Sequence, residues 1–152
     1  MRLSDSGSFE HLIPAEYCII EPMLRLALSL LLFLSAGAAM AQSKAIEVFY
    51  LGTPDCPYCR KWEANTRPGF LASPEGKAVI YVEIRGETLR QPIVARHYPA
   101  RYQWVYEQVG DSRGVPRFLL AENGKVVHSA FGTDGFEKVL LPALKKVLAR
   151  RR

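Results

Sequence analysis

Four short runs of hydrophobic residues alternate along the chain with polar stretches that contain glycine or proline. Each run is rich in β-branched and aromatic residues, which favour extended backbone, and each is short enough to cross a sheet once. The dipeptide Asn123-Gly124 separates the last two runs, and it is the strongest short signal for a β-hairpin. The pattern therefore predicts strands over residues 45–51, 78–84, 117–121 and 126–131.

Three further segments have apolar residues at spacings of three and four, which is typical of helices that pack against a core. The first opens at Cys56-Pro57, where a proline without an N–H suits the first helical turn. A right-handed crossover gives two parallel strands, and the hairpin adds two antiparallel ones. The sequence thus predicts an α/β protein with a central mixed four-stranded sheet and helices on both faces. The expected helices cover residues 56–66, 99–108 and 133–149, with a loop or short helix at 70–77.

The N-terminal part of the chain has the pattern of an export signal. Residues 26–41 form an apolar run of 16 residues that follows Arg25 and ends in Ala39-Met40-Ala41, a sequence typical of signal-peptidase cleavage. A membrane-spanning helix needs roughly 20 residues, so an uncleaved signal anchor is the weaker alternative. Residues 1–22 hold four acids against one base, whereas a signal peptide begins with positive charge. We therefore expect 1–22 to be a mis-called extension that includes Cys18, 23–41 to be the signal peptide and 42–152 to be a periplasmic domain.

Composition and charge describe one basic globular domain. Removing residues 1–41 from the 152 leaves 111 residues, and it takes away two of the 20 bases and four of the 15 acids. The net charge thereby rises from +5 to +7, which permits contact with acidic partners without naming one. The basic residues are not interleaved with aromatic ones, so we expect no nucleic-acid partner. Four arginines between the second strand and the second helix form either a solvated face or a patch for an anionic partner: Arg85, Arg90, Arg96 and Arg101.

Cys56 and Cys59 form a C-x-x-C motif that follows a strand and begins a helix. Export leads to an oxidising compartment, where cysteine pairs form disulfides. A disulfide that closes so short a loop adds little stability to a fold, so the pair predicts a redox-active disulfide. The free N–H groups at the helix start favour a thiolate and lower its pKa, which makes Cys56 the nucleophile and Cys59 the resolving thiol. The positive charges of Arg60 and Lys61 assist this effect, and Asp55 opposes it.

A metal site is the alternative use of the same two sulfurs. Zinc needs two further ligands, and the expected mature chain offers only His97 and His128, which are scattered. Two thiolates alone suit a soft ion such as Cu(I). We therefore expect no bound metal or cofactor, and a copper-binding chaperone remains the second hypothesis.

With these motifs in place, residues 45–149 resemble the thioredoxin superfamily. The resemblance implies a cis-proline opposite the redox pair, and Val115-Pro116 matches its position. In the family, backbone beside this proline pairs with the bound substrate chain. Cys-Pro-Tyr-Cys is typical of glutaredoxins and occurs in some Dsb-type proteins. The buried acid that thioredoxins carry six positions before the nucleophile is replaced here by Tyr50.

The sequence accordingly predicts an exported thiol–disulfide oxidoreductase that acts on protein substrates. The residues expected to contact substrate are Pro57, Tyr58, Val115 and Trp62. For Trp62, core packing is the favoured interpretation because large aromatic residues dominate burial, and a substrate contact is the alternative. We expect a monomer that exchanges electrons with a membrane or periplasmic partner, in a direction that the sequence leaves open. A redox-inert adaptor that uses the fold for contacts alone is a third hypothesis.

Overall fold

The computed structural model describes residues 45–151, so the predicted extension and signal peptide lie outside the described part. Its centre is a mixed sheet in the order β2-β1-β3-β4. Strand β1 pairs in parallel with β2 and antiparallel with β3, and β3 pairs antiparallel with β4. This confirms the predicted sheet, with each strand within two residues of its expected ends. The strands are β1 (Ile46–Gly52), β2 (Ile80–Arg85), β3 (Arg117–Glu122) and β4 (Lys125–Phe131).

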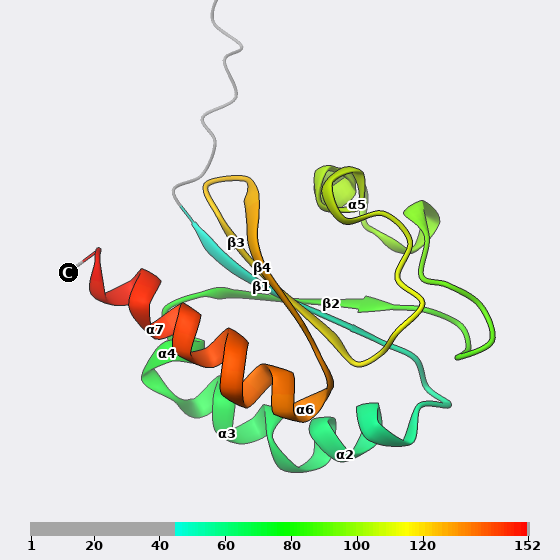
Figure 1. The fold of residues 1–152 in the computed structure, drawn as a ribbon, viewed down its shortest axis with the longest axis horizontal. Coiled ribbons are helices and arrows are strands. Elements are labelled where there is room, and N and C mark those ends of the chain that lie inside the picture. The colour runs from blue at the N-terminus through cyan, green and yellow to red at the C-terminus, as the bar shows by residue number, and fades with distance from the viewer. Residues whose placement is uncertain (1–44, 152) are drawn as a thin grey trace, which may run out of the picture. The chain divides into compact units, whose positions relative to one another are not determined.

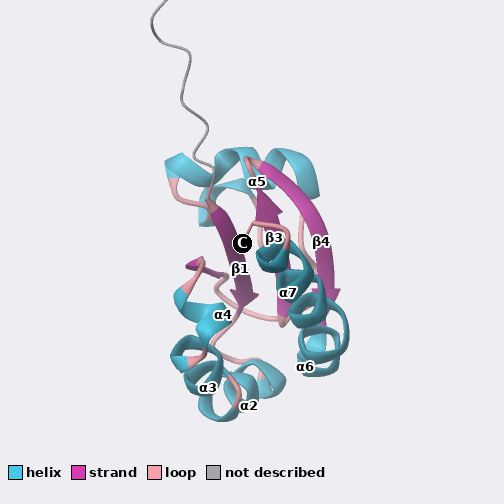
Figure 2. Cartoon of the chain, turned by 90° about the vertical axis from the view of Figure 1, so that its left-hand side faces the viewer, coloured by secondary structure: helices cyan, strands magenta, loops and turns pink. Residues whose placement is uncertain are grey.

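Helices cover both faces of this sheet (Figure 1). One face carries α2 (Pro57–Asn65), α3 (Arg67–Ala72), α4 (Pro74–Lys77), α6 (Gly132–Gly135), η3 (Phe136–Leu140) and α7 (Leu141–Ala149). The other face carries η1 (Ala95–His97), η2 (Ala100–Tyr102) and α5 (Gln103–Val109). In the C-terminal helical segment, α6 and η3 contact β3 and β4, and α7 continues the segment from η3 (Figure 2). No helix among residues 45–151 combines the length and apolar character needed to cross a bilayer.

The alternation of side chains along β1 divides the core into two clusters. Val48 and Tyr50 point toward α2 and α7, whereas Phe49 and Leu51 point toward α5. All four are fully buried, as expected for a central strand covered on both faces. The described residues therefore form a thioredoxin-like α/β fold.

Two of the predicted segments, 99–108 and 70–77, are less regular than the sequence suggested. The segment expected as a helix over 99–108 starts as the 3₁₀ turn η2, and α5 begins only at Gln103. The last residue of η2, Tyr102, has φ −117° and ψ 13°, which is outside the α region. The stretch 70–77 belongs to two short helices, and the Ser73 hydroxyl caps the second by accepting from the N–H of Gly76 at 3.1 Å.

A π-helical turn interrupts the C-terminal helix. The sequence predicts one helix over 133–149, and the structure has α6, then the π turn η3, then α7. Pro142 has no N–H and cannot donate to the carbonyl of Lys138, so the regular α-helical pattern fails at this point. The wider turn keeps Phe136 and Leu140 buried against the sheet.

Candidate functional site

The cysteine pair lies where β1 gives way to α2. Cys56 is the N-cap residue of α2, Pro57 is the first helical residue, and Cys56 and Cys59 form a disulfide with their Cα atoms 5.1 Å apart. The backbone N–H of Cys59 donates to Cys56 Sγ at 3.0 Å. The sulfur of Cys56 thus takes the role that an oxygen usually has at a helix N-cap.

The two cysteines are covered, whereas the residues between them are exposed. Cys56 and Cys59 are 1% and 0% exposed, and Tyr58 is 71% exposed. Pro57 is also exposed. The side chains of Pro57 and Tyr58 are therefore exposed beside the cysteine pair, and their contact with substrate stays a prediction.

The segment before β3 supplies the opposite side of the site. The Val115–Pro116 peptide bond is cis, and Pro116 is buried. The carbonyl oxygen of Val115 lies 3.8 Å from Cys56 Sγ. The structure therefore brings Val115 and Pro116 next to the redox pair, from a position 59 residues away along the chain.

Trp62 is not part of an exposed surface, so its assignment as a substrate contact is wrong. It is completely buried, stacks on Tyr50 with 4.7 Å between ring centroids, and packs against Phe118 and Phe136. Residues three apart share one face of a helix, and the face of α2 that carries Cys59 also carries Trp62 into the core. Tyr58 is the second residue of α2, in its first turn, and it remains the exposed aromatic residue of the site.

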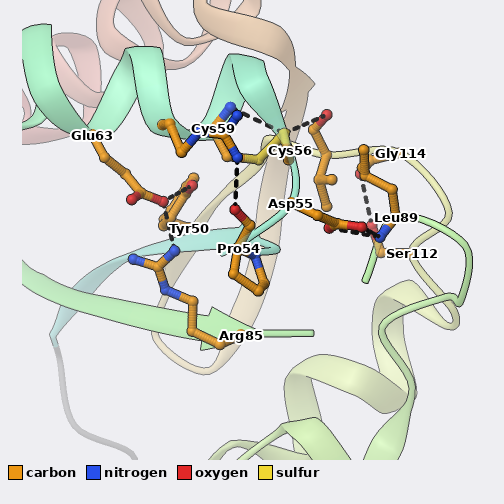
Figure 3. The surroundings of a disulfide bond; sticks show 12 residues. Tyr50, Pro54, Asp55, Cys56, Cys59, Glu63, Arg85, Leu89, Ser112 and Gly114 are labelled. Carbon is orange, nitrogen blue, oxygen red and sulfur yellow. Dashed lines mark hydrogen bonds and ion pairs between the residues drawn. A yellow bond between two sulfur atoms is a disulfide. The ribbon is translucent and has the colours of Figure 1, made fainter. Parts of the chain in front are cut away.

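Sequence reasoning missed a polar network behind the disulfide. The Tyr50 hydroxyl donates to Glu63 Oε1, and the Arg85 guanidinium binds the same carboxylate oxygen (Figure 3). Arg85 also lies 5.3 Å from the centroid of the Tyr50 ring and pairs with Glu83 at 2.9 Å. A strand tyrosine that is fully buried needs a partner for its hydroxyl, and that requirement was the available signal.

The electrostatics of this network follow from its burial and its hydrogen bonds. Partial burial alone would raise the pKa of Glu63, but the hydrogen bonds from Tyr50 and Arg85 outweigh it and hold the pKa below its usual range. Burial, together with the hydrogen bond to Glu63, raises the pKa of Tyr50. Near neutral pH the network therefore consists of a carboxylate, a neutral phenol and a guanidinium. Glu63 follows Cys59 by four residues and so lies one turn further along the same helix face.

A second missed contact involves Asp55, the residue before the nucleophile. Its carboxylate accepts from Thr88 Oγ1 at 2.6 Å and from the backbone N–H of Leu89 at 2.9 Å (Figure 3). The hydrogen bond from Thr88 is the main reason that the pKa of Asp55 lies below its usual range. The sequence treats Asp55 only as a charge that opposes the thiolate, whereas the structure also makes it an anchor for a distant loop.

The remaining candidate groups lie in separate places. Among residues 45–151 no group of three or more His, Cys, Asp or Glu side chains is arranged to hold a metal ion. The four arginines of the predicted basic insert do not share one arrangement: Arg85 joins Glu63 and Glu83, Arg96 lies 3.6 Å from Glu87, and Arg101 lies over the ring of Tyr102.

No protein-family model and no curated protein matches the chain. Among solved structures it is similar to a thioredoxin from Malassezia sympodialis, with a TM-score of 0.46 and 18% identity over 68% of this chain and 77% of that one. The periplasmic thioredoxin SoxS from Paracoccus pantotrophus gives a TM-score of 0.44 and 19% identity, over 70% of this chain and 99% of that one. Thioredoxin f from spinach chloroplast gives a TM-score of 0.46 and 18% identity, over 70% of this chain and 79% of that one. These similarities concern the fold alone.

The described part of the chain thus combines a thioredoxin-like fold with a cysteine pair that closes a disulfide at the start of its first helix.

Proposed function

We propose that the chain is an exported thiol–disulfide oxidoreductase that exchanges disulfides with protein substrates. One observation carries the proposal: the sulfur of Cys56 lies at the N-cap of α2, accepts the N–H of Cys59, and is bonded to Cys59. After reduction, a sulfur in this place is stabilised as a thiolate by the free N–H groups of the helix start. The pair then holds a nucleophile and a second thiol within reach of each other.

The reaction moves two electrons through a mixed disulfide. The Cys56 thiolate attacks one sulfur of a substrate disulfide, the substrate bond breaks, and its other sulfur leaves as a thiolate. Cys59 loses its proton to solvent and attacks Cys56 Sγ, which releases the second substrate thiolate and forms the Cys56–Cys59 disulfide. The two substrate thiolates take up two protons. The same steps in reverse oxidise a substrate dithiol, and in either direction the cysteine pair itself carries the electrons.

The groups around the pair would hold the substrate chain. Val115, whose carbonyl lies 3.8 Å from Cys56 Sγ, offers backbone for pairing, and Pro116 shapes the floor of the site. The exposed Pro57 and Tyr58 contact the substrate from the helix side. Each of these residues lies next to the reacting sulfur in sequence or in space.

Export rests on the sequence pattern of residues 23–41, and it determines the class of redox partner. In the periplasm the cysteine pair would need an external thiol or disulfide, on a membrane protein or a soluble one, to restore it after each turnover. The domain would work as a monomer, with its partners bound one at a time at Cys56.

The reduction of insulin by the dithiothreitol-reduced chain tests the proposal. We expect Cys56→Ser to abolish turnover, because the attacking sulfur is lost. The matched control is Ala64→Ser, which introduces a serine at an exposed position of the same helix and leaves the cysteine pair intact. Full activity in Cys56→Ser would contradict the proposal. A Cys59→Ala chain should stall at the mixed disulfide and so retain its physiological substrate.

Two measurements distinguish the direction of transfer and the copper alternative. A reduction potential of about −270 mV would indicate a reductase, whereas about −120 mV would indicate an oxidant. Two adjacent thiols also form a site that a soft ion accepts. Stoichiometric Cu(I) binding by the reduced chain, without turnover of any disulfide, would favour a copper chaperone instead.

A further inference from the structure

Residues 86–93 connect β2 with η1 and lie beside the cysteine pair; we refer to them as the 86–93 segment. Its first residue extends the sheet, because the N–H of Gly86 donates to the carbonyl of Gly52 at 3.0 Å. Its last residue, Ile93, exchanges both backbone hydrogen bonds with Ser112, at 2.9 and 3.0 Å. The segment is thus fixed at both ends by backbone contacts.

These anchors lead directly to the two sides of the redox site. Gly52 ends the strand that runs into Cys56. Ser112 donates its hydroxyl to the carbonyl of Gly114 at 3.1 Å, and Gly114 precedes Val115 and Pro116. In its middle, the segment is held by Asp55, which accepts from Thr88 and Leu89. A continuous set of hydrogen bonds therefore ties the 86–93 segment to both backbone stretches that flank the nucleophile.

Close packing leaves the segment little freedom. A Cβ atom at Gly86 would lie 2.7 Å from Cγ1 of Ile93 and 3.1 Å from Cγ2 of Thr53, which is closer than carbon atoms normally approach. Ile93 itself is 1% exposed and belongs to the core cluster beneath α5. The position of Leu89 next to Asp55 is therefore set by the fold (Figure 3).

Three large apolar side chains that remain exposed surround this place. Leu89 is 45% exposed, Tyr58 is 71% exposed, and Phe131 is 54% exposed. Tyr58 lies between the two cysteines, and the Phe131 ring lies 3.2 Å from where a Cβ at Gly114 would be. The three side chains come from separate elements, and each lies next to one of the two backbone stretches that flank the nucleophile. Exposed apolar surface of this kind marks a contact site. We call Tyr58, Leu89 and Phe131 the apolar rim.

The charges next to the rim are mostly positive. Three acids lie beside the rim in sequence, and each has partners. Thr88 and Leu89 donate to Asp55, Arg96 and His97 lie near Glu87, and Lys138 pairs with Asp134. Arg60, Lys61 and Arg90 lie beside the rim in sequence, and the Arg117 guanidinium lies 5.1 Å from the centroid of the Phe131 ring. An apolar rim within a basic surround is complementary to a polypeptide that carries apolar and acidic side chains.

We propose that Leu89 is a specificity-determining residue and Asp55 a positioning residue for the thiol–disulfide exchange proposed above, on which this inference rests. The substrate is an extended, acidic segment of a protein with an apolar side chain next to its cystine. That side chain packs on Leu89 while the substrate sulfur meets Cys56. Asp55 acts through the 86–93 segment, since it holds Leu89 in place.

The test measures the rate at which the chain reduces four peptide disulfides. These peptides have either leucine or serine next to the cystine, and each is made in a glutamate-rich and a lysine-rich form. Hydroxyethyl disulfide, which is too small to reach the rim, is the reference substrate. The wild-type chain should prefer the leucine peptide, and Leu89→Ser should lower this preference about fivefold, which corresponds to covering part of one leucine side chain. The matched control is Leu71→Ser, which changes a leucine of similar exposure, 39%, on α3. It should leave the preference unchanged.

Thr88→Val tests the role of Asp55 without altering its charge. Valine has the shape of threonine but no hydroxyl donor, so the preference for leucine should fall, and Thr88→Ser should restore it. The rate of each variant with hydroxyethyl disulfide is the reference to which its rates with the peptides are normalised, and Leu71→Ser should match the wild type with all substrates.

The outcomes separate the inference from the proposed function. Equal loss on the leucine and serine peptides in Leu89→Ser would overturn the role of Leu89. Equal rates for the glutamate-rich and lysine-rich peptides would overturn the acidic substrate. No turnover of hydroxyethyl disulfide by the wild-type chain would overturn the proposed function itself, and the inference with it.

Discussion

Gly52 has no side chain, and this leaves room for the hydrogen bond between Tyr50 and Glu63. It follows Tyr50 by two residues in β1, so both residues face the same side of the sheet. A Cβ atom at Gly52 would collide with the Tyr50 hydroxyl and with the ring carbon that carries it. The space left by this glycine is where the phenol lies when it donates to Glu63.

The substitution Gly52→Ala should therefore displace the Tyr50 ring and lower the free energy of unfolding by about 1–3 kcal/mol, the usual cost of overpacking a core. Urea denaturation measures this change. The matched control is Gly69→Ala in α3, where a Cβ meets nothing within 4 Å. Alanine is the better helix former, so the control should be neutral or stabilising by up to about 1 kcal/mol. Equal effects at the two positions would contradict the assigned role of Gly52.

At the scale of elements, three parts of the fold meet at Glu63. Tyr50 comes from β1, Glu63 from α2 and Arg85 from the end of β2, so their contacts join the first helix to two neighbouring strands. The Glu63 side chain is 19% exposed and that of Arg85 is 40% exposed. The pair is thus partly shielded from water. In such a place a hydrogen-bonded charge pair contributes more to the free energy of unfolding than it does on an open surface.

The network should make stability depend on acid pH. The lowered pKa of Glu63 means that its contribution is present above the ordinary carboxyl value and is lost as pH falls through the folded-state pKa. Glu63→Gln should lower the free energy of unfolding by about 1 kcal/mol at pH 7. The difference between wild type and variant should shrink below about pH 4, as unfolding measured across pH would show.

The control for this prediction is Glu107→Gln on the exposed side of α5, which should change stability by less than about 0.5 kcal/mol at every pH. A difference between wild type and Glu63→Gln that stayed constant down to pH 3 would show that the carboxylate charge is not what stabilises the network.

At the scale of the whole molecule, each face of the sheet has its own buried cluster, and both clusters draw on the central strands β1 and β3. Within residues 45–151, helices cover both clusters. The two halves of the core share their strands, so neither half can lose its packing alone.

A chain that starts at Gln42 should accordingly unfold in one cooperative transition. Far-UV circular dichroism follows the helices, and the near-UV signal follows buried aromatic residues such as Trp62. The two midpoints should coincide in the 42–152 chain and match those of the full chain. Separate midpoints, or a weakened near-UV signal in the native state, would contradict a self-sufficient domain.

The sequence was informative where structure depends on local pattern. The alternation along residues 45–51 and the proline after Cys56 predict β1 and the start of α2. The face of a helix that becomes buried depends on what packs against it, so the sequence leaves both core packing and a substrate contact open for Trp62, and the structure places it in the core. The contact of Asp55 with Leu89 spans 34 residues, and the network at Glu63 needs three elements to meet. No local pattern contains such relations.

The placement of β1 in the sheet bears on when the polypeptide can fold. Although β1 is the first strand in the described sequence, it lies inside the sheet, and its first residue, Ile46, pairs with Glu122. A nascent chain cannot complete this sheet until β3 has left the ribosome, since contacts between distant residues form late. An N-terminal targeting sequence would engage the translocation machinery before that moment. For the export proposed above, this strand order means that the polypeptide would reach the translocation machinery before its sheet is complete.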